Sequence, residues 1–239
     1  MPDTLVFIPA WNEEENLPAV LDDLRAVLPE ADVLVVDDGS TDGTAAVARA
    51  GGAEVLSFGA NRGLPAGIAA GYAHAEKHGY TFCGRVDADG QHSAAELVRL
   101  LELVRAGGCE VAVGSRFVAG EGYEAYRYRP SPARRLGTAA LRRAMGLVLD
   151  RPFGDATSGL WAVSAAALPL LARPFTTAAP EVEALIRLAD AGLRVEEVPV
   201  DMAARAGGVS KLRGSRAIRV VLTVTGALVL AKLLSLRRR

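Results

Sequence analysis

The chain has 239 residues, half of them hydrophobic, and a formal net charge of −1. This length suits one domain with an extension, and a net charge near zero identifies no partner by itself. The charge is unevenly placed, because residues 202–239 carry nine Lys or Arg and no acid, and residues 116–151 carry eight Arg against three acids. This asymmetry indicates an anionic partner without being specific for nucleic acid. The first apolar run is short and acids follow it at once, so we expect no signal peptide.

Strand-like and helix-like segments alternate along the first half of the chain. In chain order we expect a strand at 4–8, a helix at 12–28, a strand at 32–38, a helix at 40–50, a strand at 53–58, a helix at 64–78, a strand at 81–89, a helix at 93–106 and a strand at 110–115. The first helix has Asn12 as its expected N-cap, with Glu15 three residues later. Strands that alternate with helices predict a parallel sheet with helices on both faces.

Polar residues collect directly after four of these strands. They occur in the segments "PAWNEEE", "DDGS", "DADGQH" and "SRF". Because ligands bind open parallel sheets beyond the carboxyl ends of the strands, these segments predict one site built from four strand ends. The second half is less regular, with a helix expected near 133–149, a loop at 150–159, a helix at 180–192, a strand at 193–200 and a basic loop at 201–215.

Asp87 and Asp89 are two residues apart on the expected fourth strand, so their side chains are predicted to point the same way. Two carboxylates held that close repel each other unless a cation joins them. A hard divalent ion does this and keeps coordination sites free for phosphate oxygens. Gln91 is the next residue on that face and supplies a neutral oxygen. The alternative is a solvated Asp-Gly turn, in which the carboxylates accept hydrogen bonds from the backbone.

Other acidic or glycine-rich motifs fit less well. A calcium-binding loop that begins at Asp38 would have Arg49 instead of Glu at its twelfth position, and no glycine-rich dinucleotide fingerprint follows the first strand. "VDADG" also resembles the Asp-x-Asp motif of haloacid-dehalogenase-type phosphatases. Those enzymes usually place the motif on the first strand and have a later Gly-Asp-x-x-x-Asp, whereas here Gly159 lies four residues beyond Asp155. A phosphatase therefore stays as a weaker alternative.

Two later loops have the composition of a ligand-binding site. "DATSG" holds Asp155 and Gly159, and its alternative interpretation is a turn in which Asp and Thr bond to the backbone. In "RAGGVSK", Arg205, Ser210 and Lys211 lie on a glycine-rich frame that suits a loop closing over phosphates. The alternative there is a solvated basic loop.

Taken together, these residues resemble the family 2 glycosyltransferases, and within them the polyprenyl-phosphate branch that is similar to dolichol-phosphate mannose synthase. The matching motifs run nearly end to end and keep their order: "VFIPAWNEEENL", "VLVVDDGSTDGT", "NRGLPAGIAAG", "VDADGQH", "VGSRF", "DATSGL", and "EVPV" followed by "RAGGVSK". Trp11 stands where that family usually has tyrosine. A lone Asp-x-Asp motif is weakly specific, but this series of motifs in order is strongly specific.

The resemblance implies an α/β protein of GT-A fold, with a nucleotide-binding sheet, one Mg²⁺ or Mn²⁺ ion and inversion at the sugar carbon. By position, the nucleoside would be held by Pro9, Trp11, Glu13, Val36 and Asp38. The rest of the nucleotide-sugar site would comprise Asp87, Ala88, Arg116, Arg205 and Lys211, with Arg116 and Lys211 on the phosphates. The metal ion would be held by Asp87, Asp89 and Gln91. The catalytic residues would be Asp89, Arg116 and Asp155.

The same resemblance implies a lipid-phosphate acceptor. The branch usually binds the lipid phosphate with an Arg and, four residues on, a Ser; "RYRPSPARRLG" departs from that spacing, so the candidates are Arg129, Arg134 and Arg135. A phosphate acceptor is ionised at neutral pH and needs no general base, and the Arg-rich second half favours it. A saccharide or small-molecule hydroxyl would need a base, for which Asp155 and Glu181 are candidates. A non-catalytic nucleotide-sugar-binding subunit is a further alternative, against which the intact metal and phosphate residues argue.

Residues 218–239 form an apolar and basic extension to an expected domain of residues 1–217. The longest uncharged run, Val220–Ala231, has twelve residues, whereas a membrane span needs about twenty. We therefore expect a helix that lies on the membrane with its terminal arginines on anionic lipid. This would place the protein peripherally on the cytoplasmic face of the membrane. A helix packed on its own domain and a tilted span are the alternatives.

Overall fold

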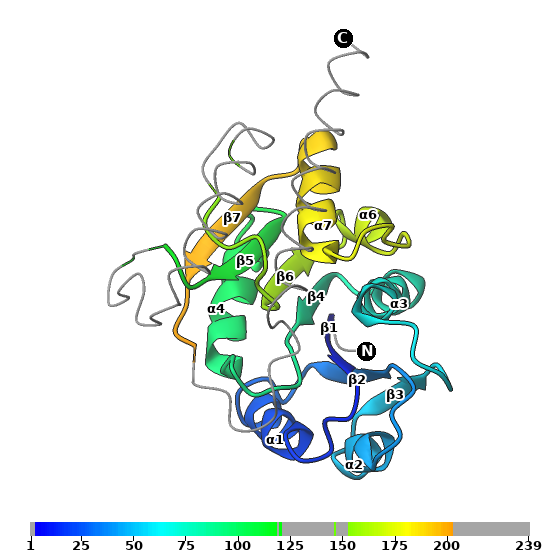
Figure 1. Cartoon of the computed structure of the whole chain (residues 1–239). Helices are drawn as coiled ribbons and strands as arrows, with labels where there is room; N and C mark the ends of the chain where they lie inside the picture. The colour runs from blue at the N-terminus through cyan, green and yellow to red at the C-terminus, as the bar shows by residue number, and fades with distance from the viewer. Residues whose placement is uncertain (1–2, 119, 121–145, 147–152, 203–239) are drawn as a thin grey trace, which may run out of the picture.

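The computed structural model describes residues 3–118, 120, 146 and 153–202 (Figure 1). In chain order, the helices and strands of these residues are β1 (Thr4–Ala10), α1 (Leu17–Val27), β2 (Asp32–Asp37), α2 (Thr44–Ala50), β3 (Glu54–Ser57), α3 (Leu64–Lys77), β4 (Phe82–Arg85), α4 (Ala94–Arg105), β5 (Val111–Ser115), β6 (Trp161–Ser164), α6 (Leu168–Leu171), α7 (Pro180–Asp190) and β7 (Val195–Pro199). The helix expected near 133–149 and the basic loop expected at 201–215 lie almost wholly outside the described residues.

The strands in this part of the chain form one seven-stranded sheet in the order β3-β2-β1-β4-β6-β5-β7. The pairs β3–β2, β2–β1, β1–β4 and β5–β7 are parallel, whereas β6 is antiparallel to both of its neighbours, β4 and β5. The predicted, mostly parallel α/β sheet is confirmed, but β6 was not predicted. It is a four-residue strand in a longer apolar run, and periodicity alone does not distinguish a strand from a helix in such a run.

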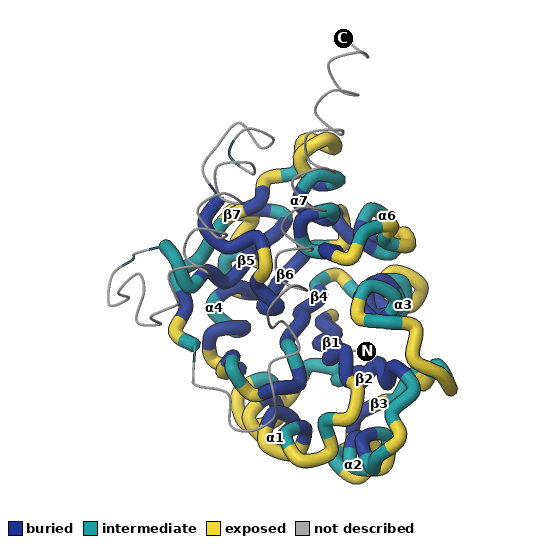
Figure 2. The backbone as a smooth tube through the Cα atoms, viewed as in Figure 1, coloured by how far each residue is buried: buried dark blue, intermediate teal, exposed yellow. Residues whose placement is uncertain are grey.

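Helices cover both faces of the sheet (Figures 1 and 2). One face packs against α3, α6 and α7, and the other packs against α1, α2 and α4. The side chains of β1 alternate between the two cores, because Leu5 and Phe7 belong to the first and Val6 and Ile8 to the second. A strand that is buried on both faces is apolar nearly throughout. This is why β1, which is buried at every position, reads as a continuous hydrophobic run.

A close approach between α3 and β1 depends on glycine. A Cβ atom at Gly71 would lie 2.2 Å from the Phe7 ring. A Cβ atom at Gly67, one turn earlier, would meet Pro9 at 3.6 Å and Val36 at 3.9 Å, which are ordinary contact distances. Gly71 therefore sets how closely α3 packs on the sheet, and Gly67 does not.

Gly71→Ala is expected to lower the free energy of unfolding by about 1–3 kcal/mol, because the added methyl group overpacks against Phe7 by more than the gain in helix propensity offsets. Gly67→Ala is the matched control, since it adds the same group to the same helix where there is room. That variant should keep its stability or gain up to about 1 kcal/mol. Urea unfolding measures the difference, and equal stability of the two variants would contradict the close packing.

Candidate active site

The loops that follow β1 and β2 are bound to each other. Asn12 has a positive φ of 54°, its side-chain oxygen accepts a hydrogen bond from Thr41 N, and its own N donates to Ser40 Oγ. Asn12 is therefore not the N-cap of α1, and that prediction is wrong: the helix begins at Leu17, with Asn16 at the N-cap position. Asparagine tolerates the left-handed region, and its side chain bonds to a neighbouring loop here instead of capping a helix.

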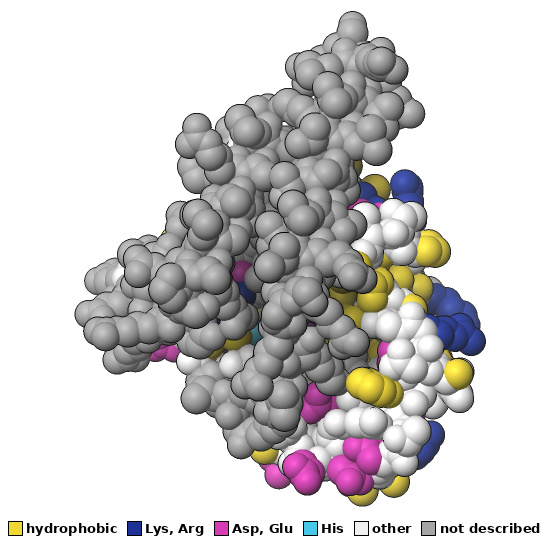
Figure 3. All heavy atoms as spheres, viewed as in Figure 1, with side chains coloured by type: hydrophobic (Ala, Val, Ile, Leu, Met, Phe, Trp, Pro, Cys, Tyr) yellow, Lys and Arg dark blue, Asp and Glu magenta, His cyan; other side chains and the backbone are white. Residues whose placement is uncertain are grey.

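Two further hydrogen bonds, one of them to a carboxylate, join these two loops. Glu14 Oε2 accepts a hydrogen bond from Gly43 N at 2.6 Å, and Glu13 N donates to Thr44 Oγ1 at 2.9 Å. Trp11, just before them, is 38% exposed. Figure 3 shows acidic side chains gathered at the edge of the molecule where α1 and α2 lie in Figure 1. The two loops thus form one connected rim at the carboxyl ends of β1 and β2.

Three of the residues predicted to hold the nucleoside lie at the base of this rim. Pro9 and Val36 are register partners in the pair β1–β2. Asp38 is buried, and its two carboxylate oxygens accept hydrogen bonds from Arg62 N at 2.6 Å and from Gly63 N at 2.8 Å. Asp38 therefore fixes the loop that enters α3, and its contact with a nucleoside stays a prediction.

The Asp-x-Asp segment lies in a turn beyond the end of β4. The strand ends at Arg85, Gly90 has a positive φ of 70°, and Gln91 N donates to Asp89 Oδ1 at 3.1 Å. The prediction that Asp87 and Asp89 share one face of an extended strand is therefore wrong. Glycine at position 90 and the backbone hydrogen bond to Asp89 produce the alternative, an Asp-Gly turn.

His92 marks a point where several charged groups meet. This side chain is buried. Burial lowers the pKa of His92, Asp87 and Asp89 oppose that shift together with Asp155, and Arg116 adds to it. Direct contacts agree with this grouping: Gly159 packs against Asp87, and Arg116 donates to Asp155, so the turn after β4, the end of β5 and the loop before β6 come together at the carboxyl end of the sheet.

Arg116, directly after β5, forms a bidentate ion pair with Asp155. Its Nε and Nη2 donate to the two carboxylate oxygens at 2.6 and 2.7 Å, and Asp155 is 1% exposed. Glu197, in β7, accepts hydrogen bonds from Gly154 N at 2.6 Å and from Asp155 N at 2.8 Å. A chain of charge-assisted hydrogen bonds therefore runs from β7 through this loop to the end of β5.

A second buried ion pair adjoins Asp87. Arg85, the last residue of β4, is 2% exposed, and its Nη2 donates to Glu181 Oε1 at 2.9 Å and to Asp87 Oδ1 at 3.3 Å. Burial lowers the pKa of Arg85, but Glu181 and Asp87 raise it by more, so the guanidinium stays charged. A Cβ atom at Gly159 would lie 1.9 Å from Asp87 Oδ2. The glycine of "DATSG" therefore leaves the room that this carboxylate occupies.

Sequence reasoning did not assign Arg85, His92 or Glu197 to the site. The signal for Arg85 was an arginine inside the apolar segment "FCGRV", since a buried charge needs a partner. That partner, Glu181, lies 96 residues further along the chain and was considered only as a general base. Nothing in the sequence "LRVEEVPV" distinguishes Glu197 from its neighbour Glu196 as the residue that faces the loop.

Ala88, also predicted for the nucleotide-sugar site, is buried in the turn after β4. Five further predicted site residues lie outside the part of the chain that the structure describes. They are Arg129, Arg134, Arg135, Arg205 and Lys211. The extension 218–239 lies outside it as well. Within the described ranges, no helix has the length and apolar character needed to cross a membrane, and no three or more His, Cys, Asp or Glu side chains are grouped so as to hold a metal ion.

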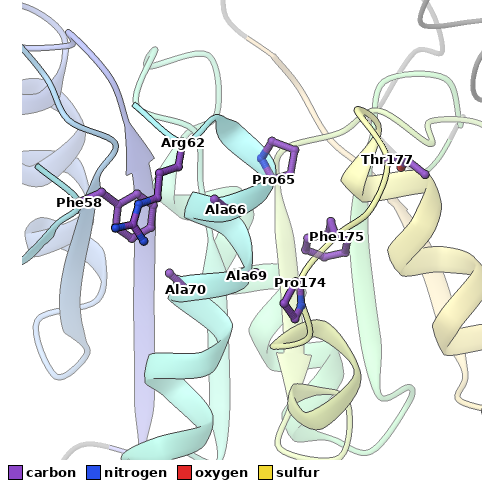
Figure 4. A pocket seen from close by; sticks show the side chains of 9 residues that line it. All are labelled: Phe58, Arg62, Pro65, Ala66, Ala69, Ala70, Pro174, Phe175 and Thr177. Carbon is purple, nitrogen blue, oxygen red and sulfur yellow. The ribbon is translucent and has the colours of Figure 1, made fainter. Parts of the chain in front are cut away.

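A hollow of about 440 Å³ lies between α3 and the segment that follows α6 (Figure 4). Its lining is mostly apolar, with Arg62 and Thr177 as exceptions, and the Arg62 guanidinium lies 4.9 Å from the centroid of the Phe58 ring. No predicted site residue that the structure describes lines this hollow. The chemistry expected from the sequence therefore belongs to the carboxyl end of the sheet and not to this hollow.

Comparisons with known proteins identify the family. The family model described as "Glycosyl transferase family 2" matches residues 5–168. This chain belongs to that family. The polyprenol monophosphomannose synthase of Mycolicibacterium smegmatis is 34% identical over 221 residues, which cover 89% of this chain and 82% of the relative. The undecaprenyl-phosphate mannosyltransferase of Micrococcus luteus is 35% identical over 229 residues, which cover 92% of each chain.

The fold of this family 2 glycosyltransferase is also found in a solved structure. Glucosyl-3-phosphoglycerate synthase from Mycobacterium tuberculosis, in complex with Mn²⁺, uridine diphosphate and glucosyl-3-phosphoglycerate, matches it with a TM-score of 0.67 and 23% identity, over 93% of this chain and 80% of that one. The predicted GT-A fold and the predicted glycosyltransferase activity are confirmed. The phosphatase and the non-catalytic subunit are excluded by the same findings.

Glu197→Gln is expected to lower the free energy of unfolding of this glycosyltransferase by about 1–3 kcal/mol, because an amide replaces the carboxylate that accepts two backbone hydrogen bonds. Glu196→Gln makes the same change at the exposed neighbouring position of β7 and should alter stability by less than about 0.5 kcal/mol. Urea unfolding followed by tryptophan fluorescence measures both variants. If the two variants lose the same stability, Glu197 does not hold the loop before β6.

Proposed function

We propose that this family 2 glycosyltransferase moves a sugar from a nucleotide-sugar to a polyprenyl phosphate, with inversion at the sugar carbon. The observation that carries the proposal is the likeness, over 89% and 92% of this chain, to two enzymes whose names specify a polyprenyl phosphate and mannose. These names favour mannose as the sugar. The Arg-rich composition of residues 116–151 fits an acceptor that carries a phosphate.

The ion pairs of the site also favour a phosphate acceptor over a hydroxyl. A hydroxyl acceptor needs a general base within hydrogen-bond reach. Of the two candidates, Asp155 has both oxygens bound by Arg116, and Glu181 is bound by the buried Arg85. A carboxylate whose oxygens accept hydrogen bonds from an arginine is less available to accept one from an acceptor hydroxyl. A phosphate, which is already ionised at neutral pH, needs neither residue to remove a proton.

The donor would lie across the carboxyl end of the sheet. Pro9 and Val36 are buried register partners at the ends of β1 and β2, beneath the proposed position of the nucleoside, and Trp11, which is 38% exposed, is proposed as the ring on which the base stacks. Breaking the bond between the sugar and the diphosphate develops negative charge on the leaving group, and fixed cations stabilise that charge. Arg116, which Asp155 holds in place, is proposed as one such cation, and Arg205 and Lys211 are proposed on the sequence alone.

Asp87, Asp89 and the side chain of Gln91 are proposed to hold Mg²⁺ or Mn²⁺. All three supply oxygen, and one or two carboxylates that share the ion with substrate phosphates are a usual arrangement for Mg²⁺. Glycine at position 159 is needed for this position of Asp87, because a Cβ atom there would lie 1.9 Å from Asp87 Oδ2. The Asp87 side chain is still 36% exposed, which leaves it accessible to an ion. When bound, the ion supplies Lewis-acid stabilisation of the leaving diphosphate.

We further propose that the protein works peripherally on the cytoplasmic face of a membrane. A polyprenyl phosphate is a membrane lipid, so the enzyme must reach the bilayer surface. Residues 218–239 combine an apolar run with three terminal arginines. That composition suits a segment that binds an anionic membrane surface, and it supports the division into a domain of residues 1–217 and this extension.

Turnover with a panel of GDP- and UDP-sugars, each with and without a polyprenyl phosphate, tests the proposed function. We expect one donor, a mannose donor, to give a lipid-phosphate-linked sugar that mass spectrometry detects. With a saccharide supplied in place of the lipid phosphate, transfer should be absent, because Asp155 and Glu181, the two candidate bases among the described residues, are both bound to arginine. Transfer to a saccharide hydroxyl with none to the lipid phosphate would contradict the proposed acceptor.

The same assay tests the metal assignment with a pair of variants. Asp89→Asn keeps the shape of the side chain and removes a carboxylate, and it should lower turnover about 100-fold or more, since Lewis-acid stabilisation contributes several kcal/mol. Glu15→Gln makes the equivalent change at an exposed position of the rim and should leave turnover unchanged. Full turnover of the Asp89 variant, or of the wild type in excess chelator, would contradict a metal ion at this position.

Deleting residues 218–239 is expected to weaken binding to anionic liposomes by at least about tenfold, because each arginine near such a surface contributes on the order of 1 kcal/mol. Turnover on a polyprenyl phosphate in liposomes should fall with it, while the affinity for the donor nucleotide should not change. Liposome flotation and nucleotide titration measure the two quantities. A full-length protein that does not bind anionic liposomes would contradict the proposed membrane association.

A further inference from the structure

The buried Arg85 binds two carboxylates, those of Asp87 and Glu181, through the same nitrogen atom. Both hydrogen bonds come from Arg85 Nη2, and the bond to Glu181 is the shorter, at 2.9 Å against 3.3 Å to Asp87. Among the residues that the structure describes, none accepts a hydrogen bond from Arg85 Nε. The guanidinium therefore binds the two carboxylates unequally: its hydrogen bond to Glu181 is the stronger and its hydrogen bond to Asp87 is the weaker.

Glu181 has a fixed position in a helix. It lies in the first turn of α7, directly after Pro180, where the helix dipole favours an acidic side chain. Its side chain is 12% exposed, whereas that of Asp87 is 36% exposed. The pair between Arg85 and Glu181 is thus the better shielded from water of the two, and Coulomb attraction is stronger where water is excluded.

Asp87 cannot easily leave its shared position. Its Oδ2 lies where a Cβ atom at residue 159 would be, so the backbone of the loop before β6 closes one side of the carboxylate. Its Oδ1 faces Arg85. The negative charge that Asp87 can present to a bound cation therefore depends mainly on how strongly Arg85 binds its carboxylate. A change of the Asp87 rotamer matters less.

We infer that Glu181 is a positioning residue for the metal site: by engaging Arg85, it keeps that arginine from neutralising Asp87 and so leaves Asp87 able to bind a divalent cation. This inference rests on the proposed assignment of Asp87 as a metal ligand. An arginine that paired fully with Asp87 would compete with the cation for the same oxygens. Glu181 acts at a distance from the cation, through Arg85, and removes no proton from the acceptor.

The experiment measures Mn²⁺ binding to the full-length protein by electron paramagnetic resonance of the free ion, with and without added nucleoside diphosphate. Glu181→Gln should weaken Mn²⁺ binding about tenfold, because Arg85 then has Asp87 as its single carboxylate partner. The double variant with Arg85→Met and Glu181→Gln should bind Mn²⁺ within about threefold of the wild type, since the competing cation is gone as well. Thermal unfolding of each variant shows that it is folded.

Glu183→Gln is the matched control on the same turn of α7. It removes the same charge, but Glu183 is bound by Arg187 and by the backbone of Thr176 and Thr177, and not by Arg85. It should change Mn²⁺ binding by less than about twofold. An equal loss in the Glu181 and Glu183 variants would overturn the inference, because it would show a general effect of charge and not competition through Arg85.

The remaining outcomes separate the inference from the proposal on which it rests. Normal Mn²⁺ binding by Glu181→Gln, with tight binding by the wild type, would overturn the inference and leave the metal site standing. A double variant as weak as Glu181→Gln would overturn it too, because removing Arg85 would then bring no recovery. If the double variant does not fold, the inference is still tested by comparing the Mn²⁺ binding of Glu181→Gln with that of Glu183→Gln. A wild type that binds no Mn²⁺, even with nucleoside diphosphate, would overturn the proposed metal site itself.

Discussion

The bidentate ion pair between Arg116 and Asp155 joins two parts of the chain that lie 39 residues apart. Both side chains are largely withdrawn from water, so loss of either one would leave an uncompensated buried charge, which is strongly destabilising. Glu197 also binds this loop, by accepting hydrogen bonds from two of its backbone N–H groups. The loop before β6 therefore has little freedom, and the place of Gly159 against Asp87 follows from that restriction.

The direction of β6 is the second requirement for this arrangement. The strand enters the sheet between β4 and β5, with Trp161 opposite both Arg85 and Val113. Because β6 is antiparallel to these neighbours, the residues that precede it lie at the carboxyl ends of β4 and β5, where the Asp-x-Asp turn and Arg116 are. A parallel strand would have begun at the other end of the sheet and would have carried the loop away from Asp87. One antiparallel strand in a mostly parallel sheet thus brings a loop from far along the chain to the carboxyl end of the parallel strands.

Elements with a distinctive local residue pattern could be predicted from the sequence, whereas elements without such a pattern could not. β1, β2 and β5 were predicted because strands that are buried on both faces are continuous apolar runs. β6 was not, because four apolar residues that lead into a helix carry no distinguishing period. From the sequence, the turn at Asp87 to Gly90 is the alternative interpretation, because the residue pattern does not show that Gln91 N donates to Asp89.

The candidate site was predicted in composition but not in its internal pairing. The sequence marked the acids and cations at the strand ends, since motif order and residue type carry that information. It did not show which acid meets which cation, because Asp155 and Arg116, or Glu181 and Arg85, meet only through the tertiary fold. The proposed roles changed accordingly: Asp155 and Glu181 were candidates for a general base, and the structure gives each of them an arginine.

That pairing has a consequence for the kind of substrate the site suits. A nucleotide-sugar and a polyprenyl phosphate are both anionic, and both would have to approach a region that contains several carboxylates. Unpaired acids there would repel them, whereas acids that are bound to arginine or to backbone N–H groups present far less negative field. Asp38 is neutralised in part by the backbone N–H groups of Arg62 and Gly63, Asp155 by Arg116, and Glu181 by Arg85. The internal pairing of acids is therefore a condition for bringing two phosphate-bearing substrates together, and not only a means of tolerating buried charge.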